Sequence, residues 1–340
     1  MKKILLIFAL LGTLVLLATG CGAPKTGETP QTPAKEASQM ETAKKVKLGI
    51  IQIVEHAALD SARKGFLDVL TENGYKDGEN LEVDYQNAQS DQSNLKTIAQ
   101  KFVTGNKDLV LAIATPSAIT MASETETIPI LITAVTDPVA AKLVISNDKP
   151  DTNVTGTTDM TPVKEQLKLL QKIMPNVKKV GVIYNSSEVN SEIQVNIAEK
   201  ASAELGLVLV KASVTGSAEV MQIAQSLVGK VDAIYVPTDN VVASSIASVV
   251  SICEKNKLPL IVGESGMVKG GALATIGLDY YKLGRQTGEM AVRIIKGDKP
   301  QTMAIESLKD IDIEINTGAA KRMGVTIPQD ILSKAKQVYK

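Results

Sequence analysis

From residue 46 onward, short apolar runs of strand length alternate with longer segments of helical period. The expected strands are residues 46–53, 81–85, 109–113 and 128–132, and the helices between them are 57–73, 94–103 and 117–124. Near-continuous apolar strands are typical of a parallel sheet that helices cover on both faces. This alternation therefore predicts an α/β fold and excludes an all-helical or all-β one.

The same alternation then starts again. The second series has expected helices at residues 162–174, 189–205, 220–228 and 241–256, and expected strands at 179–184, 207–211, 233–236, 260–262 and 272–276. Two successive series of similar size predict two Rossmann-like lobes with parallel sheets. A late helix, 282–296, has no strand of its own before the short strand 311–315, so we expect the chain to cross back and add this helix to the first lobe.

The first 45 residues do not share this pattern. Lys2 and Lys3 precede an apolar run that ends in Ala18-Thr19-Gly20-Cys21, which resembles the lipobox of bacterial lipoproteins. We expect a signal peptide over residues 1–20, lipidation of Cys21 and a flexible tether over 21–45, where prolines and polar residues replace apolar periodicity. An ordinary secretory signal with a coincidental cysteine is the alternative.

The expected lobes are discontinuous in the sequence. Residues 46–158 plus 278–300 form the first lobe, and residues 159–277 plus 301–340 form the second. Such lobes enclose a cleft, and ligands of open α/β sheets bind outside the carboxyl ends of the strands. The residues that follow each strand are therefore the candidates for a binding site.

Composition excludes several kinds of site. Lysine plus arginine and aspartate plus glutamate each number 37, so a basic nucleic-acid-binding surface is not indicated. A single histidine, His56, excludes multi-histidine metal sites, and two cysteines, Cys21 and Cys253, exclude disulfide scaffolds and thiolate zinc sites. No phosphate-binding loop or nucleophile elbow is present. We expect no metal and no cofactor.

Polar side chains gather at the predicted strand ends. The candidate ligand-binding residues are Gln52, Glu55, His56, Thr115, Ser117, Thr136, Asp137, Tyr184, Asn185, Ser186, Asp239, Asn240, Glu264, Asp279 and Tyr280. Short polar residues at such positions also serve as helix caps or turn residues, so a local role remains open for several of them. His56 is either a structural residue or, in a hydrolase, a catalytic one.

Several short motifs at the predicted strand ends, here called strand-end phrases, carry a more specific resemblance. They are residues 112–118 (AIATPSA), 133–139 (TAVTDPV), 184–188 (YNSSE), 237–240 (PTDN) and 284–288 (GRQTG). Together with the lipobox and the two lobes, they resemble the tryptophan/tyrosine-type substrate-binding lipoproteins of ABC transporters. The resemblance covers residue 46 to the C-terminus.

The resemblance implies a type I periplasmic-binding-protein fold with three hinge crossovers and no enzymatic activity. It also implies a free amino acid, often aromatic, as ligand, and an ABC permease with its ATPase as partners. We expect a monomer on the outer face of the bacterial cytoplasmic membrane, anchored through Cys21, that closes on its ligand. The alternatives are a surface adhesin, with or without transport, and a hydrolase that uses His56.

An amino-acid ligand would give each group of candidates a role. Hydroxyl and N–H donors near Thr115, Ser117 and Thr136 suit the carboxylate. Asp137, Asp239, Glu264 or Asp279 suit the ammonium, Tyr184, Tyr280 and Val54 suit an apolar wall, and His56, Glu55 or Gln52 suit a ring hydroxyl. Aromatic residues make up only 3% of the chain, which keeps a branched aliphatic ligand open, and the absence of tryptophan disfavours a sugar.

Overall fold

The structure is a computed structural model that describes residues 45–340. The expected signal peptide, Cys21 and all of the expected tether except Lys45 lie outside the described residues.

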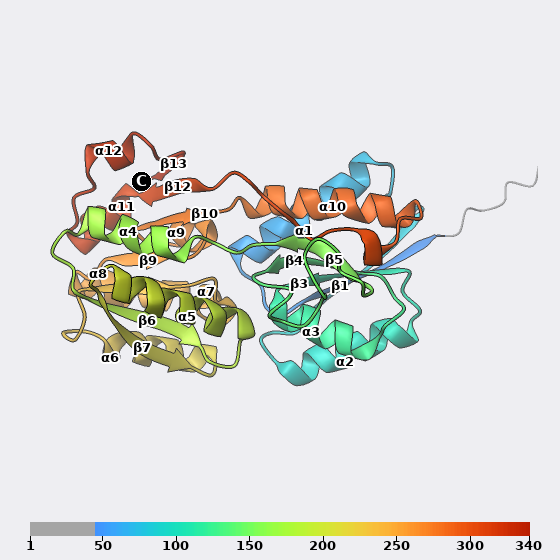
Figure 1. Ribbon diagram of the computed structural model, residues 1–340, viewed down its shortest axis with the longest axis horizontal. Coiled ribbons are helices and arrows are strands. Elements are labelled where there is room, and N and C mark those ends of the chain that lie inside the picture. Colours follow the sequence, from blue (N-terminus) through green and yellow to red (C-terminus); the bar gives the residue numbers. More distant parts are fainter. Residues whose placement is uncertain (1–44) are drawn as a thin grey trace, which may run out of the picture. The chain divides into compact units, whose positions relative to one another are not determined.

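The first lobe is built on a parallel six-stranded sheet with the order β11-β5-β4-β3-β1-β2 (Figure 1). Every residue of β3 and β4 is buried, because helices cover both faces of the sheet. The strands are β1 (Val46–Gln52), β2 (Leu81–Asn87), β3 (Leu109–Ile113), β4 (Ile130–Val135), β5 (Val154–Thr158) and β11 (Glu306–Ser307).

The late helix belongs to this lobe, as the sequence predicts. The helices of the first lobe are α1 (Ala57–Glu72), α2 (Gln92–Thr104), α3 (Thr115–Glu124), α10 (Tyr280–Ile295) and the short 3₁₀ turn η2 (Pro300–Thr302). Helix α10 packs along α1 (Figure 1), and both need glycine where they cross. A Cβ on Gly284 would lie 1.9 Å from the Ala62 carbonyl oxygen, and one on Gly65 would lie 2.1 Å from that of Tyr281.

The second lobe contains a seven-stranded sheet with the order β13-β12-β10-β9-β8-β6-β7. Its strands are β6 (Lys179–Asn185), β7 (Val208–Val214), β8 (Ala233–Val236), β9 (Leu260–Val262), β10 (Ala274–Gly277), β12 (Asp312–Asn316) and β13 (Gln337–Tyr339). Its helices are α4 (Val163–Ile173), α5 (Val189–Glu204), η1 (Ser217–Glu219), α6 (Val220–Ser226), α7 (Asn240–Ser244), α8 (Ile246–Asn256), α9 (Ser265–Lys269), α11 (Thr317–Met323) and α12 (Gln329–Leu332).

The two sheets share one topology. Without their late additions, the strands run β2-β1-β3-β4-β5 in the first lobe and β7-β6-β8-β9-β10 in the second. In this order the crossover connections change direction between β1 and β3 in the first lobe and between β6 and β8 in the second. Doubly wound folds bind ligands at such a point. Two such switch points, one in each lobe, contribute to the site described below.

Within the described residues, the chain passes between the sheets three times: after β5, between β10 and α10, and between β11 and β12. The two α/β lobes and the three crossovers confirm the predicted fold class. The last crossover follows β11, which pairs with β5, and therefore lies a few residues beyond the expected boundary at residue 300.

Several local features differ from the sequence-based expectation, among them the following three. Strand β5 was not expected, since its Val-Thr-Gly-Thr-Thr sequence has few large apolar residues. The helix expected over 241–256 is broken at Ser245 into α7 and α8. In the mainly parallel second sheet, β12 runs antiparallel to β10, and β13 pairs with β12 to form the edge.

Candidate functional site

A small cavity lies between the two lobes, at the carboxyl ends of their strands. The space in it that a water molecule could occupy is only about 10 Å³, so the side chains of the two lobes nearly fill the cavity. Its lining residues are His56, Leu59, Ala134, Thr136, Asp159, Asn190, Thr238, Asp239, Asn240, Ala243, Glu264 and Tyr280. Both lobes contribute, so a molecule held here would touch both.

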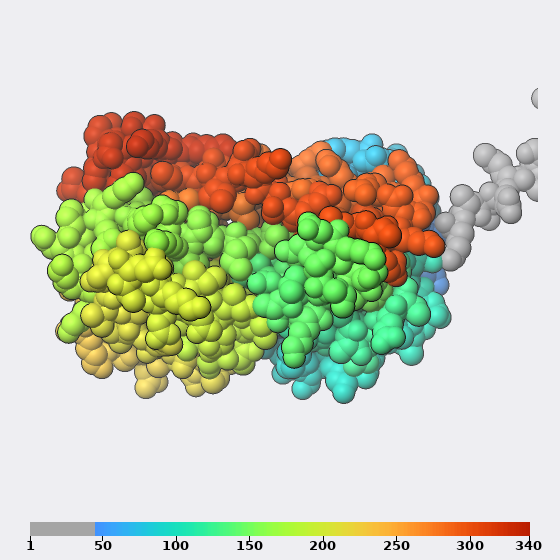
Figure 2. Space-filling model, viewed as in Figure 1, coloured from blue at the N-terminus to red at the C-terminus, as the bar shows by residue number. Residues whose placement is uncertain are grey.

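Side chains of the two lobes also contact each other directly around this cavity. His56 Nε2 lies 3.4 Å from Asn240 Oδ1, and the hydroxyls of Thr136 and Thr238 are 3.5 Å apart. Gln194 Nε2 on α5 donates to Thr136 Oγ1 at 3.4 Å. Figure 2 shows the yellow atoms of the second lobe meeting the green and cyan atoms of the first. The lobes are therefore closed on each other.

The second-lobe wall is a network centred on the buried carboxylate of Glu188, which precedes α5. Asn190 Nδ2 donates to Glu188 Oε2 at 3.0 Å, and Asn240 Nδ2 donates to the same oxygen at 2.5 Å. The Val241 N–H donates to Oε1 at 3.3 Å. The network joins the start of α5 to the start of α7 and fixes both amide side chains.

Asp239 has a similar role in the same wall. Its carboxylate accepts from the Asn185 N–H at 2.5 Å, from Ser191 Oγ at 2.6 Å and, as the N-cap of α7, from the Val242 N–H at 2.8 Å. Glu264 likewise accepts from the N–H groups of Gly266 and Met267 at the start of α9. Both oxygens of each carboxylate are thus used within the second lobe.

The first-lobe wall has strained backbone where β3 and β4 end. Ala114 has φ 76° and Ala134 has φ 56°, a region that non-glycine residues seldom occupy. Ala114 precedes α3, and Ala134 lines the cavity. Such strain concentrates at functional sites, where the surrounding structure holds it in place.

Several polar atoms near the cavity are buried without a hydrogen-bond partner in the described part of the chain. They are Thr115 Oγ1, Ser117 Oγ, Asp159 Oδ1 and Asn190 Oδ1. Asp159 and Asn190 line the cavity, whereas Thr115 and Ser117 lie in the first turn of α3, at the same edge of the first sheet. Buried polar groups in native proteins are normally paired, so an unpaired set calls for an explanation.

Burial shapes the charge of the cavity. Desolvation raises the pKa of Glu188 and of Glu264 to about 7 and also raises the pKa of Asp159. Desolvation lowers the pKa of His56 to about 4, which keeps its imidazole neutral at pH 7. No lysine or arginine among residues 45–340 lines the cavity. The site is thus acidic, with no protein cation to balance it.

Six of the expected site residues line the cavity: His56, Thr136, Asp239, Asn240, Glu264 and Tyr280. Two others lie nearby but are used within the first lobe. Gln52 donates to the Val54 carbonyl and to Asp60 and accepts from Arg63, while the exposed Glu55 accepts from the Tyr85 hydroxyl.

Five further expected residues do not line the cavity and instead form contacts within their own turn, helix start or lobe. Asp137 accepts from the N–H groups of residues 139 and 140 in its own turn, and Asp279 caps α10. Tyr184 packs in the second-lobe core, Asn185 accepts from Ser187, and Ser186 is exposed.

Sequence reasoning missed half of the cavity lining. The residues not expected are Leu59, Ala134, Asp159, Asn190, Thr238 and Ala243. Asp159 was missed because it follows the unexpected strand β5. The β-branched residues of 154–158, interrupted by Gly156 and followed by an aspartate, are the weak signal that the sequence offers for both.

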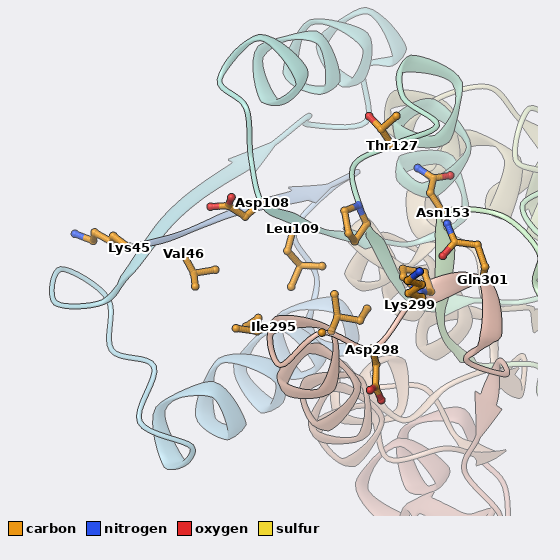
Figure 3. A pocket seen from close by; sticks show the side chains of 14 residues that line it. Lys45, Val46, Asp108, Leu109, Thr127, Asn153, Ile295, Asp298, Lys299 and Gln301 are labelled. Carbon is orange, nitrogen blue, oxygen red and sulfur yellow. The ribbon is translucent and has the colours of Figure 1, made fainter. Parts of the chain in front are cut away.

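A larger pocket lies elsewhere in the first lobe (Figure 3). Val46 and Leu109, the first residues of β1 and β3, line it, so it opens at the sheet edge opposite to the cavity. All of its lining residues belong to the first lobe, and a ligand there would not bridge the lobes.

The described residues also show no group of three histidine, cysteine, aspartate or glutamate side chains that could hold a metal ion. None of the helices in residues 45–340 is long and apolar enough to cross a membrane.

Comparison with known proteins identifies the family. Residues 47–339 match the profile described as ABC transporter substrate binding protein. The chain belongs to this family. Its members are solute-binding proteins of the type I periplasmic-binding fold, not enzymes. The resemblance inferred from the strand-end phrases is thereby confirmed.

Relatives of this substrate-binding protein have known ligands. A tyrosine-binding protein of Clostridioides difficile (strain R20291) is 43% identical over 328 residues, which cover 95% of this chain and 92% of that protein. A domain from Streptococcus pneumonia, solved in complex with L-Trp, is 38% identical, has a TM-score of 0.84 and covers 87% of this chain and 100% of that one.

A third relative differs in conformation. It is a ligand-free, open substrate-binding protein with adhesive properties from Clostridium difficile, 47% identical, with coverage of 87% of this chain and 99% of that one. Its TM-score is only 0.65, lower than that of the L-Trp complex despite its higher identity. This contrast agrees with the direct contacts between the lobes: the present structure is a closed form.

Proposed function

We propose that this protein captures an aromatic amino acid, tyrosine or tryptophan, in the cavity between its lobes and delivers it to an ABC permease for import. The relationship to a tyrosine-binding and an L-Trp-bound protein supports this ligand class. The observation that carries the proposal is the closed cavity that both lobes line and in which buried polar atoms lack partners.

The hydroxyls of Thr115 and Ser117 suit the carboxylate of such a ligand. Both are buried, both lack partners in the described chain, and both lie in the first turn of α3. The N–H groups of that turn are free of intrahelical bonds and add the positive end of the helix dipole. Neutral donors and a helix end can together hold an anion without a lysine or arginine.

The apolar lining suits the side chain of the ligand. Leu59, Ala134, Ala243 and the ring of Tyr280 supply this surface. His56, which is neutral and contacts Asn240, is the polar group available to a ring hydroxyl or indole N–H. In this arrangement the ring faces both lobes, so its binding favours the closed form over the open one.

The protein is expected to act outside the cytoplasm, anchored by lipid at Cys21. The lipobox-like sequence before Cys21 supports this location. Metabolic labelling with a fatty acid tests it: Cys21→Ser should abolish the label and release the protein from the membrane fraction. Label that persists in this variant contradicts the anchor.

Ligand binding is tested by thermal unfolding of the full chain, purified in detergent, with each of the twenty amino acids. A ligand at one hundred times its Kd adds about 2.7 kcal/mol of stability, hence several degrees in Tm. We expect the shift with tyrosine or tryptophan. A shift with none of the amino acids contradicts the proposal, and a shift only with leucine, isoleucine or valine replaces the aromatic ligand by an aliphatic one.

A second function, contact with other cell surfaces, is supported by the relative with adhesive properties. Its test is the binding of the purified protein to host cells with and without tyrosine. Saturable binding in both conditions supports a separate adhesive surface, and the absence of saturable binding contradicts it.

A further inference from the structure

Gln194 on α5 is a buried polar side chain of the second lobe that reaches across to the first. It has no exposed surface and is not among the residues that line the cavity. Its Oε1 accepts from the Thr238 N–H at 3.2 Å, and its Nε2 donates to the Asn190 carbonyl at 3.3 Å and to the Thr238 hydroxyl. The same Nε2 lies 3.4 Å from Thr136 Oγ1 in the first lobe. The amide is thus anchored in one lobe and bonded to the other.

Thr136 and Thr238 complete this contact between the lobes. Their hydroxyls are 3.5 Å apart, and both side chains line the cavity. Thr136 is held on its own side, because its carbonyl accepts from the Thr158 hydroxyl at 2.7 Å. We call the three side chains of Gln194, Thr136 and Thr238 the interlobe latch. Each of them is at least nine-tenths buried, which makes their hydrogen bonds stronger than they would be in water.

The latch belongs to a closure that leaves no room for an aromatic ligand. The free space in the cavity is about 10 Å³, which holds no more than one water molecule. Cavities that bind small molecules measure roughly 300–1,000 Å³. A tryptophan or tyrosine molecule can therefore enter only when the lobes separate further. The form with the latch made and the form with a ligand between the lobes are two different states.

Two states that exclude each other compete. A ligand has to displace the latch, so part of its binding free energy is used to break these contacts. When only a fraction of the molecules can accept a ligand, the apparent Kd is the intrinsic Kd divided by that fraction. We propose that the interlobe latch holds the lobes closed in competition with the ligand, and that Gln194 thereby limits the affinity of the protein without contacting the ligand.

This inference concerns the regulation of the proposed binding site and rests on the proposed function for its ligand. It predicts an effect opposite to that of a binding residue. Loss of a ligand contact weakens binding, and by different factors for different ligands. Loss of the latch tightens binding, and by the same factor for every ligand, because the latch is made only in the form that holds no ligand.

The first test is calorimetric titration of the full chain, purified in detergent, with L-tryptophan and with L-tyrosine. The variant is Gln194→Met, which keeps the length of the side chain and removes its amide. The matched control is Gln166→Met, since Gln166 is an equally buried glutamine of the second lobe. Its amide is bonded to the Gly263 and Ile276 carbonyls and to the Tyr235 hydroxyl, and none of these partners belongs to the first lobe.

We expect Gln194→Met to bind both amino acids roughly threefold to tenfold more tightly than the wild-type chain, since a neutral buried hydrogen bond shifts an equilibrium by about that factor. Gln166→Met should bind them as the wild-type chain does. Thermal unfolding without ligand should give a lower Tm for both variants, because each leaves buried partners unsatisfied. Unchanged or weaker binding by folded Gln194→Met overturns the inference.

A second test needs no change in the latch. Spin labels on Thr97→Cys in α2 and Gln225→Cys in α6, two exposed positions on different lobes, report the lobe separation by double electron–electron resonance. The chain also carries Cys21→Ser, and Cys253 does not take the label, because it is buried and desolvation raises the pKa of its thiol to about 12. Without ligand, we expect a population with a shorter distance than the tryptophan-bound chain shows.

The distances also separate a failed latch from a failed function. If every distance without ligand equals or exceeds the bound one, the latch is not formed and the inference is overturned, while the proposed function stands on the titrations. If the chain binds neither amino acid, the proposed function fails, and the distances without ligand still decide on the latch. A shift to longer distances in Gln194→Met then supports it, and an unchanged distribution overturns it.

Discussion

The carboxylates of the second-lobe wall satisfy their own hydrogen bonds, with Asn190 Oδ1 the unpaired polar atom on that side, whereas hydroxyls of the first lobe near the cavity have no partner in the described chain. Glu188 and Asp239 each accept several bonds from neighbours in the second lobe. In the first lobe, Thr115 and Ser117 in the first turn of α3 have buried hydroxyls without partners in the described chain. A wall whose polar groups are already hydrogen-bonded gains few hydrogen bonds from a ligand, whereas a wall with unpaired polar groups gains several. We therefore expect the ligand to bind the first lobe first and the second lobe to close over it.

The largest expected effect is on the stability of the second-lobe wall. Asp239→Ala leaves three donors without their acceptor, and each buried unsatisfied group costs about 1–3 kcal/mol. We expect the free energy of unfolding in urea to fall by about 3 kcal/mol or more. The sequence suggests a ligand-binding role for Asp239, whereas its hydrogen bonds within the second lobe indicate a structural one.

The control for this change is Asp91→Ala, which removes an exposed helix cap and should cost about 1 kcal/mol. Equal losses in the two variants contradict the idea that the second-lobe network stabilises the fold.

The next effect is a pH dependence that arises in the same wall. Burial raises the pKa of Glu264 to about 7, above its value in the unfolded chain. A group with a raised pKa contributes stability below its unfolded pKa and loses it as the pH rises through the folded one. Between pH 4.5 and 7, Glu264 should thus lower the free energy of unfolding by an amount on the order of 3 kcal/mol.

Urea unfolding at several pH values measures this slope, and Glu264→Gln should flatten it. Glu188 has the same direction of shift and remains in the variant, so part of the slope should persist. A variant with the wild-type slope shows that Glu264 is not the source.

A smaller effect, on affinity instead of stability, is expected in the first-lobe wall. Thr115→Val and Ser117→Ala each remove an unpaired hydroxyl, so the ligand-free stability should change by less than about 0.5 kcal/mol. If the hydroxyls bind the ligand carboxylate, affinity for tryptophan should fall roughly tenfold to a hundredfold per variant. Unchanged affinity in both variants removes these hydroxyls from the site and breaks the contrast between the walls.

The smallest effect concerns the direct contact between the lobes. His56 Nε2 and Asn240 Oδ1 are 3.4 Å apart, a long hydrogen bond. His56→Ala should weaken tryptophan binding by only about threefold, since the ligand and not this contact stabilises the closed form. A much larger loss for tyrosine than for tryptophan in calorimetric titration indicates that His56 binds the ring hydroxyl.

Much of the fold and part of the site follow from local sequence. The periodicity predicts two α/β lobes, and the rule that ligands bind at the carboxyl ends of parallel strands finds His56, Thr136 and Asp239. It fails at Asp159, because β5 contains threonines and a glycine in place of large apolar residues, and the strand forms through pairing with β4 and β11. Strands that depend on neighbours in the sheet are weakly marked in sequence.

What the sequence by itself determined is the order of strands and helices, the two lobes and the polarity of the strand ends, because these depend on patterns within about twenty residues. Which polar groups stay available to a ligand was decided only by the tertiary structure. Asp239 meets the Asn185 N–H across 54 positions, and Asp159 meets Tyr280 across 121. Whether a carboxyl group can still accept a hydrogen bond from a ligand depends on such distant partners, which local sequence patterns do not specify.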